Sequence, residues 1–424
     1  MREQTESSDA LSVTAADVDA AAERLTGVVG SSPLQLCKRL SERYAAEVYL
    51  KREDLQEVRS FKLRGAYNKM STLSRDEAAR GVVCASAGNH AQGVAYACSL
   101  LGIAGTVFMP AITPMQKIDR VRHFGRDLVE VRLVGESYDD ASQAAHEYAD
   151  ATGRAFVHPF DDPATIAGQG TVGRELLEQM RGCPDVVVVG IGGGGLIGGI
   201  ATYLHEHCPD VTVIGAEPAG APAMYESLRR GELVVLDQID TFIDGAAVKS
   251  VRESTFRICQ RLVAEVVPVA EGAVCTALIE LYQNEGIIAE PAGALAVSAL
   301  EHLGDALRGR RVVCVLSGGN NDILRYPEIM ERSLVHQGRK HYFIVEFAQK
   351  PGQLRQFVDR ALGPTDDIVR FEYMKKTNKE RGAALVGIEL RSRDDLEPLL
   401  RRMEEIQMKY TRLTSDELLY EHLV

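Results

Sequence analysis

Between residues 15 and 330, short apolar runs alternate with segments of helical periodicity, and this alternation constrains the fold more than any other feature of the sequence. Amphipathic segments such as YDDASQAAHEYADATG and ATIAGQGTVGRELLEQM separate the runs. The alternation predicts an α/β fold with parallel sheets, and near-continuous apolar runs are typical of strands that helices cover on both faces. Nine runs are predicted as strands: AEVYLKRE, GVVCAS, AGTVFMP, DLVEVRLVG, AFVHPF, DVVVVG, VTVIGAE, AEVVPVA and RVVCVLSGG.

The pattern changes after Leu324, where ERSLVHQGRK predicts a polar connector. Strand HYFIVEF, turn AQKPG, helix QLRQFVDRAL, strands IVRFEYMK and AALVGIEL, helix DLEPLLRRMEEIQM and strand YTRLT follow it. This βαββαβ order predicts a ferredoxin-like α+β unit. We therefore expect a first domain over residues 1–335 and a second over 336–424.

Composition and charge exclude some classes of protein. The 424 residues suffice for two or three domains, and 45% apolar with 25% charged residues is ordinary for a soluble globular chain. The net charge of −12, without a long Lys/Arg cluster, disfavours nucleic acids and acidic membranes as partners. The N-terminal MREQTESSDALSV lacks the apolar core of a secretory signal and is expected to be a disordered tail.

The eight cysteines are scattered along the chain and none forms C-x-x-C. Several lie in apolar runs such as VVCVL, so we expect small buried residues in a reducing compartment, which is consistent with the cytoplasm. The sequence contains neither a G-x-x-x-x-G-K-[ST] loop nor H-E-x-x-H or paired Cys/His spacing. It therefore predicts neither a P-loop nor a catalytic metal.

The stretch VVVVGIGGGGLIGG (186–199) contains seven glycines in fourteen residues. Gly190, Gly192 and Gly195 satisfy G-x-G-x-x-G, and Glu217 ends a later strand-like run, which is a pattern of dinucleotide-binding proteins. A membrane span is a second interpretation, because the stretch and its continuation are uncharged, but valines followed by glycines favour strand, loop and helix. A third is a loop that holds another phosphate on its backbone N–H groups.

Three further motifs could line the same crevice as this loop: SFKLRGA (60–66), SAGNHAQG (86–93) and SGGNND (317–322). In the first, Lys62 stands between apolar neighbours, and burial there would favour a neutral, nucleophilic amine. The alternative is an ordinary solvated lysine at a helix start. In the second, small residues before a helix would leave backbone N–H groups free for a carboxylate or phosphate, unless Ser86 or Asn89 simply caps the helix.

Three polar residues in or near these motifs have competing interpretations. His90 is a candidate acid–base group, although a hydrogen-bonded structural histidine is equally consistent with the motif. The Ser317 hydroxyl ends a strand and could donate to a ligand, or it could begin a glycine turn. Glu290 precedes a helix with Pro291 at its first position, where a carboxylate stabilises the helix dipole.

Together, the order and spacing of the four motifs resemble those of the β-family, or fold type II, of pyridoxal-phosphate enzymes, and above all the threonine dehydratases, also called threonine deaminases. The resemblance runs from SSPLQ near residue 32 to about residue 330, and KREDLQEVRSFKLRGA and SAGNHAQGVA are close to family signatures. It implies two open, twisted, mainly parallel sheets flanked by helices, with a smaller subdomain at about 63–160. The unit at 336–424 resembles the ACT-like regulatory domain of biosynthetic members, here as a single copy.

The resemblance also implies roles for individual residues. Lys62 would bind pyridoxal 5'-phosphate covalently and act as the catalytic base, with Phe61 beside the cofactor. Asn89 would bond the phenolic oxygen of the cofactor and Ser317 its ring nitrogen. The G-x-G-x-x-G match then becomes incidental and Glu217 structural. Two sets complete the site, a phosphate loop of Gly192, Gly193, Gly194, Gly195 and Leu196, and a substrate-carboxylate loop of Ser86, Ala87, Gly88, Asn89 and His90.

The implied reaction converts L-threonine to 2-oxobutanoate and ammonia, the first step toward isoleucine, with L-serine as a secondary substrate. The resemblance further implies a homo-oligomer, a dimer or tetramer, inhibited by isoleucine at the turn formed by Gln349, Lys350, Gly352 and Leu354. A serine racemase or serine dehydratase of the same fold is an alternative, as is cysteine or threonine synthase chemistry on an activated ester. A non-catalytic amino-acid-sensing regulator is a third possibility, against which the intact Lys62 argues.

Overall fold

The computed structural model describes residues 11–373 and 380–413. Residues 1–10 of the predicted tail lie outside the described residues, whereas Val13 at its end is buried against the core, contrary to the prediction. The chain forms two compact units. The first contains the residues up to 271 together with 284–321, and the second contains 272–283 and the residues from 322 onward. The predicted domain boundary between residues 335 and 336 stays a prediction.

The larger sheet of the first unit has the strand order β1-β2-β10-β7-β8-β9. All neighbouring strands are parallel except β1, which pairs antiparallel with β2 at the edge. The strand bounds are β1 (Leu34–Leu36), β2 (Glu47–Arg52), β7 (Val186–Gly190), β8 (Thr212–Pro218), β9 (Glu265–Val269) and β10 (Arg311–Leu316).

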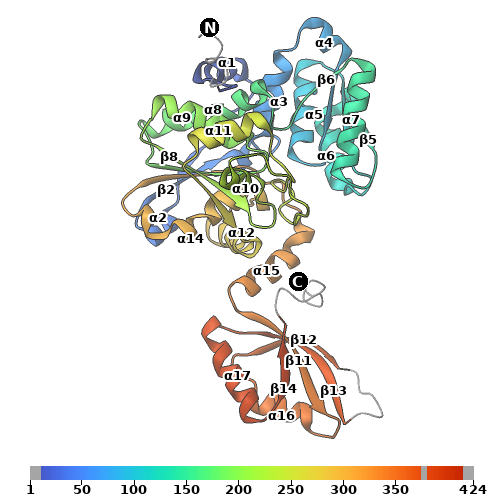
Figure 1. The fold of residues 1–424 in the computed structure, drawn as a ribbon, viewed down its shortest axis with the longest axis vertical. Helices are drawn as coiled ribbons and strands as arrows, with labels where there is room; N and C mark the ends of the chain where they lie inside the picture. The colour runs from blue at the N-terminus through green and yellow to red at the C-terminus, as the bar shows by residue number, and fades with distance from the viewer. Residues whose placement is uncertain (1–10, 374–379, 414–424) are drawn as a thin grey trace, which may run out of the picture. The chain divides into compact units, whose positions relative to one another are not determined.

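The smaller sheet is entirely parallel and has the order β5-β4-β3-β6. Its strands are β3 (Val82–Ala85), β4 (Gly105–Met109), β5 (Val129–Leu133) and β6 (Ala155–Phe156), and α5 (Asn89–Leu101), α6 (Met115–Gly125) and α7 (Tyr138–Thr152) lie around it (Figure 1). Each of the nine predicted strands is present, and the predicted α/β fold with two mainly parallel sheets is confirmed. β1 was not predicted, because three residues are too few to show a periodicity.

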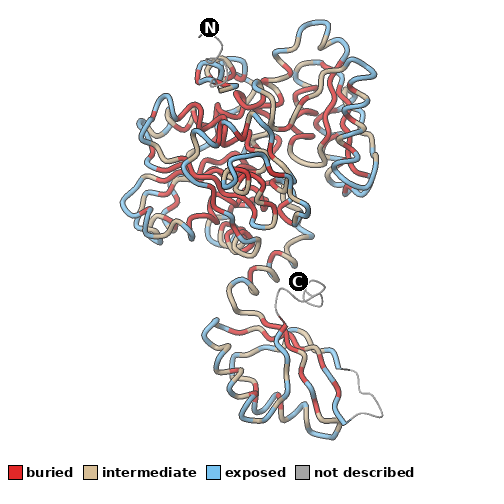
Figure 2. Tube along the Cα trace, viewed as in Figure 1, coloured by how far each residue is buried: buried red, intermediate tan, exposed pale blue. Residues whose placement is uncertain are grey.

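Helices cover both faces of the larger sheet, as its continuous apolar strands predict. Val187 and Val189 belong to a cluster with α8 (Pro163–Met180) and α9 (Gly195–His207), while Gly190 faces Leu295 of α13 (Pro291–Ser298). The most buried segments therefore follow the strands (Figure 2). The remaining helices of this unit are α1 (Ala15–Leu25), α2 (Lys38–Tyr44), α3 (Lys62–Ser71), α4 (Arg75–Arg80), α10 (Ala223–Arg230), α11 (Glu253–Leu262) and α14 (Leu300–Leu303), with 3-10 turns at Glu53–Leu55, Arg126–Leu128 and Gly304–Leu307.

Helices α3, α8 and α9 cross at points where glycine lets their backbones approach. A Cβ atom added at Gly168 of α8 would stand 2.7 Å from the Cα atom of Gly65 in α3. One added at Gly170 would stand 2.8 Å from the carbonyl oxygen of Gly199 in α9. These crossings bring α3 and α9 against the same helix, and each begins at a motif that the sequence singled out.

A buried ionic network holds α3 in place two residues after Lys62. The Arg64 guanidinium is 2.8 Å from Glu53 and 2.7 Å from Glu175, and Lys51 lies 2.7 Å from the same Glu175. Arg64 and Glu53 are almost completely buried. Because each buried charge depends on its partners, removing one of them would leave the others uncompensated.

The second unit contains a four-stranded antiparallel sheet of order β12-β13-β11-β14, which is the ferredoxin-like order. The predicted βαββαβ succession is confirmed, although the ends of IVRFEYMK and YTRLT fall outside the described residues. The predicted connector ERSLVHQGRK is helical over residues 331–336, which belong to α15. The elements of the second unit are α15 (Tyr326–His336), β11 (Lys340–Ala348), α16 (Gln353–Arg360), β12 (Asp367–Tyr373), β13 (Arg381–Glu389), α17 (Leu396–Glu405) and β14 (Lys409–Arg412), with 3-10 turns at Ile323–Arg325 and Arg393–Asp395. The unit also contains most of α12 (Glu271–Glu285).

The cysteines correct one expectation. Six of them are free and buried, as predicted, but Cys183 and Cys208 form a disulfide. The pairing has no local sequence signal, because the fold brings together the segment before β7 and the segment after α9. Within residues 11–373 and 380–413, no helix is both long and apolar enough to cross a membrane, and no three His, Cys, Asp or Glu side chains gather as metal ligands.

Candidate active site

The start of α3 and the end of β10 are joined by backbone contacts, which brings two of the predicted motifs together. The backbone N–H of Phe61 donates to the carbonyl oxygen of Ser317 at 3.1 Å, and Ser60 forms an antiparallel bridge with Gly318. A Cβ atom added at Gly93 of α5 would lie 3.0 Å from the Lys62 backbone. The motifs around residues 62, 89 and 317 therefore meet, as the sequence predicts.

Lys62 is the first residue of α3 and is half-buried. Its Nζ atom donates to the carbonyl oxygen of Pro159 at 2.9 Å and lies 5.1 Å from the centroid of the Phe61 ring. Burial lowers the pKa of Lys62 from its ordinary 10.5 to about 8, against the opposing attraction of Glu290. Burial thus makes the neutral amine more accessible than in an ordinary lysine, in the direction expected from the apolar neighbours.

Asn89 takes part in a chain of polar contacts that the sequence did not reveal. Its Nδ2 atom donates to Oε1 of Glu290 at 2.5 Å, and its Oδ1 atom accepts from Nδ2 of Asn320 at 2.7 Å. Burial raises the pKa of Glu290 to about 7, so this carboxyl changes charge near neutral pH. From the sequence, we predicted only a helix-dipole role for Glu290. Its contact with Asn89, 201 positions away, has no local sequence signal.

The SAGNH loop forms the N-terminus of α5 without a side-chain cap. Gly88 occupies the N-cap position, and a Cβ atom added there would meet nothing within 4 Å. The simple capping interpretation for Ser86 or Asn89 is therefore wrong, because the Ser86 hydroxyl accepts instead from the N–H of Gly88 at 3.2 Å. The first turn of α5 therefore has backbone N–H groups without a side-chain acceptor, and the space beside Gly88 is open, which suits a small anion.

His90 is buried, and its Nε2 atom is 2.8 Å from the carbonyl oxygen of Val157. Nε2 must donate there, so Nδ1 carries no proton in the neutral ring. Burial lowers the pKa of His90 to about 3. This geometry favours the structural interpretation of His90 over an acid–base role.

The glycine-rich loop connects β7 to the N-terminus of α9. Gly194 is the N-cap residue, with φ of +89°, a left-handed conformation that favours glycine, and no side chain caps the helix. The N–H groups of the first turn of α9, starting at Gly195 and Leu196, have no acceptor within the helix. Such a terminus attracts a phosphate group. Glu217, by contrast, accepts from two backbone N–H groups at the start of α10 and is structural, as expected.

The segment His158–Phe160 lies against both the glycine loop and Lys62, and the sequence analysis missed it. A Cβ atom added at Gly193 would overlap the Phe160 ring, and one at Gly195 would lie 2.9 Å from the Phe160 carbonyl oxygen. The His158 ring meets the Phe160 ring edge-on at 4.7 Å, and its Nδ1 atom accepts from the N–H of Asp161 at 2.8 Å. The only available signal was the position of HPF directly after a strand-like run.

Ser317 follows β10 and is buried, and its hydroxyl donates to the carbonyl oxygen of Ala292 at 3.3 Å. A Cβ atom added at the next residue, Gly318, would overlap Oε1 of Glu290. Ser317 therefore lies close to the Asn89–Glu290 pair. Its long hydrogen bond leaves the hydroxyl able to exchange Ala292 for a ligand acceptor.

The residues present fit pyridoxal phosphate. An uncapped helix N-terminus at Gly194 could hold its phosphate group, and the half-buried amine of Lys62 has the lowered pKa that a Schiff-base lysine needs. Ser317 and Asn89 offer a hydroxyl and an amide for its polar ring atoms. The fold and this set of residues together define a pyridoxal-phosphate enzyme of fold type II.

Comparison with known proteins agrees. Residues 25–318 match the pyridoxal-phosphate dependent enzyme family, and residues 331–423 match the C-terminal regulatory domain of threonine dehydratase. The biosynthetic L-threonine dehydratase of Bacillus subtilis is 52% identical over 95% of this chain and 95% of its own. That of Mycobacterium tuberculosis strain H37Rv is 53% identical over 99% of this chain and 98% of its own. The chain therefore belongs to the biosynthetic threonine dehydratase family.

Two solved structures resemble about three quarters of this chain. The processed form of threonine deaminase isoform 2 from Solanum lycopersicum has a TM-score of 0.72 and 41% identity, and the alignment covers 75% of this chain and 92% of that one. Maize serine racemase has a TM-score of 0.71 and 28% identity, with 77% of this chain and 99% of that one covered. The fold is thus shared by enzymes named for two different reactions.

The predicted effector residues lie at the turn between β11 and α16. Gly352 is the N-cap of α16 with φ of +89° and no side-chain cap, and Lys350 is exposed. The Gln349 side chain donates to the carbonyl oxygen of Arg381 at 3.3 Å, while the Leu354 side chain is 48% exposed. The turn therefore combines free helix N–H groups with an accessible apolar side chain.

Proposed function

We propose that this protein converts L-threonine to 2-oxobutanoate and ammonia, and L-serine to pyruvate more slowly, as the first step toward isoleucine. The observation that carries the proposal is the convergence of Lys62, Asn89, Ser317 and the glycine loop in one unit. Identity of about half over nearly the whole length with biosynthetic L-threonine dehydratases supports threonine as the substrate.

Bound pyridoxal phosphate supplies an electron sink for the bond that breaks at the substrate α-carbon. Lys62 would hold the cofactor through its amine and would serve as the base for the α-proton of the substrate. With a pKa of about 8, roughly a tenth of free Lys62 amines are neutral at pH 7, against fewer than about one in a thousand for an ordinary lysine. The carbonyl oxygen of Pro159 accepts from this amine and holds it at the start of α3.

The other residues bind and orient. The first turn of α9, with the loop from Gly192 to Leu196, would hold the cofactor phosphate. Ser317 would bond the ring nitrogen and Asn89 the phenolic oxygen, with Phe61 beside the ring. The uncapped loop Ser86–His90 holds the substrate carboxylate on its backbone N–H groups. Ser317 would offer the ring nitrogen a neutral hydroxyl, which does not enforce protonation of that nitrogen as a carboxylate would.

The test is the absorbance spectrum of the purified protein before and after addition of threonine, with 2-oxobutanoate assayed in parallel. We expect a visible cofactor band that changes with threonine, and product formation that Lys62→Ala abolishes. A protein that racemises serine without forming 2-oxobutanoate would instead be a racemase of the same fold. A colourless protein that binds amino acids without turnover would be a regulator.

We further propose that the second unit binds isoleucine and inhibits the enzyme. The exposed turn Gln349–Gly352 offers helix N–H groups for a carboxylate, and Leu354 offers an apolar contact. An allosteric coupling of about 1–3 kcal/mol would shift the apparent threonine affinity roughly 5–150-fold. Truncation after Gln337 should preserve the cofactor spectrum and abolish the response to isoleucine in initial-rate measurements. A full-length enzyme that ignores isoleucine would leave an oligomerisation role for this unit.

A homo-oligomer, a dimer or tetramer, and a cytoplasmic location complete the proposal. Light scattering on the full-length holoenzyme tests the assembly. A monomer that retains full isoleucine sensitivity would refute the need for a homo-oligomer.

A further inference from the structure

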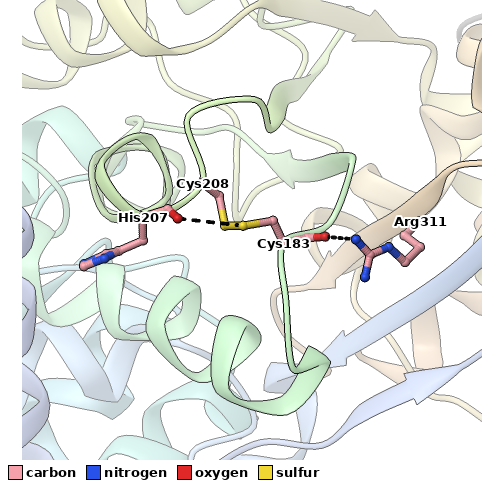
Figure 3. The surroundings of a disulfide bond; sticks show 4 residues. All are labelled: Cys183, His207, Cys208 and Arg311. Carbon is pink, nitrogen blue, oxygen red and sulfur yellow. Dashed lines mark hydrogen bonds between the residues drawn. A yellow bond between two sulfur atoms is a disulfide. The ribbon is translucent and has the colours of Figure 1, made fainter.

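Cys183 and Cys208 join the two ends of the segment that carries the glycine loop. Cys183 lies in the connection from α8 to β7, and Cys208 directly follows α9 (Figure 3). They are 25 positions apart, and everything between them is β7, the glycine loop and α9. The disulfide therefore closes the base of one strand–loop–helix unit, at the end opposite to the loop.

The two sulfur atoms differ in access. Cys183 is exposed, whereas Cys208 is only 2% exposed. The six other cysteines are buried, and burial raises the pKa of thiols such as Cys98, to about 12. Among the described residues, Cys183 is thus the cysteine that a soluble oxidant or thiol can reach, and reactivity follows access and thiolate character.

Polar contacts at the same place hold Cys183 beside its partner. The Arg311 guanidinium of β10 donates to the carbonyl oxygen of Cys183, and Sγ of Cys183 lies 3.7 Å from the carbonyl oxygen of His207 (Figure 3). The backbone N–H of Cys208 donates to Leu204 at 2.7 Å, which anchors it to the last turn of α9. These contacts anchor the backbone on both sides of the disulfide, at Cys183 and at the end of α9.

We propose that Cys183 and Cys208 are a reversible redox modification site, and that the closed disulfide slows loss of the cofactor by restraining the β7–α9 unit. The second part rests on the proposed phosphate role of the glycine loop. Reduction of the disulfide would let α9 and its N-terminus move relative to β7. Such movement would weaken phosphate binding at the glycine loop, which connects the two elements. A cross-link acts by removing such open states.

The oxidant is a low-molecular-weight disulfide, RSSR. The Cys183 thiolate attacks one of its sulfur atoms, so that a mixed disulfide forms and one RS⁻ leaves. Cys208 then loses its proton and attacks the Cys183 sulfur, which expels the second RS⁻. Two protein thiols become one disulfide, and RSSR becomes two RSH. Excess thiol reverses both steps.

Thiol counting on the full-length holoenzyme tests the first part. The protein is equilibrated with oxidised and reduced glutathione, quenched in acid, denatured and alkylated. We expect six alkylated cysteines after oxidation and eight after reduction, with the Cys183 and Cys208 peptides linked only in the oxidised sample. Cys183→Ser should show seven in both states. Eight thiols at every ratio, or glutathione retained on Cys183 without closure, would overturn the proposal.

Cofactor release tests the second part. The rate is followed by absorbance after dilution into a carbonyl scavenger, for oxidised and reduced wild type, and for Cys208→Ser as a variant that cannot close. We expect release to be at least about threefold faster from the reduced protein, and insensitive to glutathione in the variant. Equal rates in both states would refute the restraint. Failure to see any bound cofactor in either state would instead count against the proposed function, because thiol counting does not depend on it.

Discussion

Replacing Lys62 with methionine should change how the stability of the cofactor-free protein depends on pH. Burial lowers the pKa of Lys62 from its ordinary 10.5 to about 8, so the folded protein holds the proton less tightly than the unfolded chain. The unfolded chain binds more protons, and stability therefore rises with pH between about 8 and 10.5. Below that window the charged amine is a constant cost of folding.

The size of this cost follows from the shift. At about 1.36 kcal/mol per pKa unit, the shift corresponds to at most about 3 kcal/mol. Because Lys62 is only half-buried, solvent screening reduces this to about 1–3 kcal/mol. Methionine removes the charge and also the hydrogen bond to Pro159, whose loss costs about 1 kcal/mol. The variant should thus equal or exceed wild type in stability at pH 7, and fall below it at pH 10.

The assay is thermal unfolding of both apoproteins at pH 7 and pH 10. For a unit of roughly 300 residues, each kcal/mol moves the midpoint by about 1.5 °C. The difference between the two midpoints should therefore shift by about 2–4 °C in favour of wild type. Titrating groups that do not interact with Lys62 are present in both proteins and cancel in the difference, whereas Glu290 loses its interaction with Lys62 in the variant. Midpoints that move in parallel would show that Lys62 carries no burial cost.

Three further predictions concern neighbouring residues. Because burial raises the pKa of Glu290 from its ordinary 4.5 to about 7, apoprotein stability should fall as pH rises from about 4.5 to 7, by up to about 3 kcal/mol, and Glu290→Gln should flatten that fall in thermal unfolding. Arg64→Met should cost about 3–5 kcal/mol in urea unfolding by leaving buried carboxylates unpaired, whereas Arg174→Met in the partly exposed pair of α8 should cost less than about 1 kcal/mol. Gly193→Ala should weaken cofactor binding tenfold or more in equilibrium titration, about 1.4 kcal/mol, and Phe160→Ala should restore part of it.

Much of the fold follows from periodicity. Strands buried on both faces leave continuous apolar runs, so segments such as Val186–Gly190 stand out from the helices between them. β1 escaped because an edge strand of three half-exposed or exposed residues, Leu34–Leu36, has no such run. α15 was not predicted as a helix, because the polar and charged residues of ERSLVHQGRK favoured a connector.

The site was predictable where motifs follow strands, since the ends of parallel strands meet at one edge. Asn89 and Ser317 belong to this group, whereas Lys62, ten residues after β2, was singled out by its apolar neighbours. Glu290 and Phe160 do not, because their importance lies in contacts with Asn89 and Gly193 that no local pattern encodes. The disulfide was not predicted for the same reason, since only the fold of β7 and α9 brings Cys183 and Cys208 together.

The glycine-rich loop shows why a residue type alone does not identify a ligand contact. Gly194 needs its left-handed φ, whereas Gly193 must stay small because the Phe160 ring occupies the space beside it. Loss of cofactor from Gly193→Ala could therefore come from a displaced ring, and the double variant with Phe160→Ala separates ring displacement from obstruction of the phosphate. Gly198 supplies the matched control, because a Cβ there would meet Ile258 at an ordinary 3.5 Å. Gly198→Ala should leave binding unchanged, and a large loss there would mean that the backbone of α9, and not its N-terminal loop, is what the substitutions disturb.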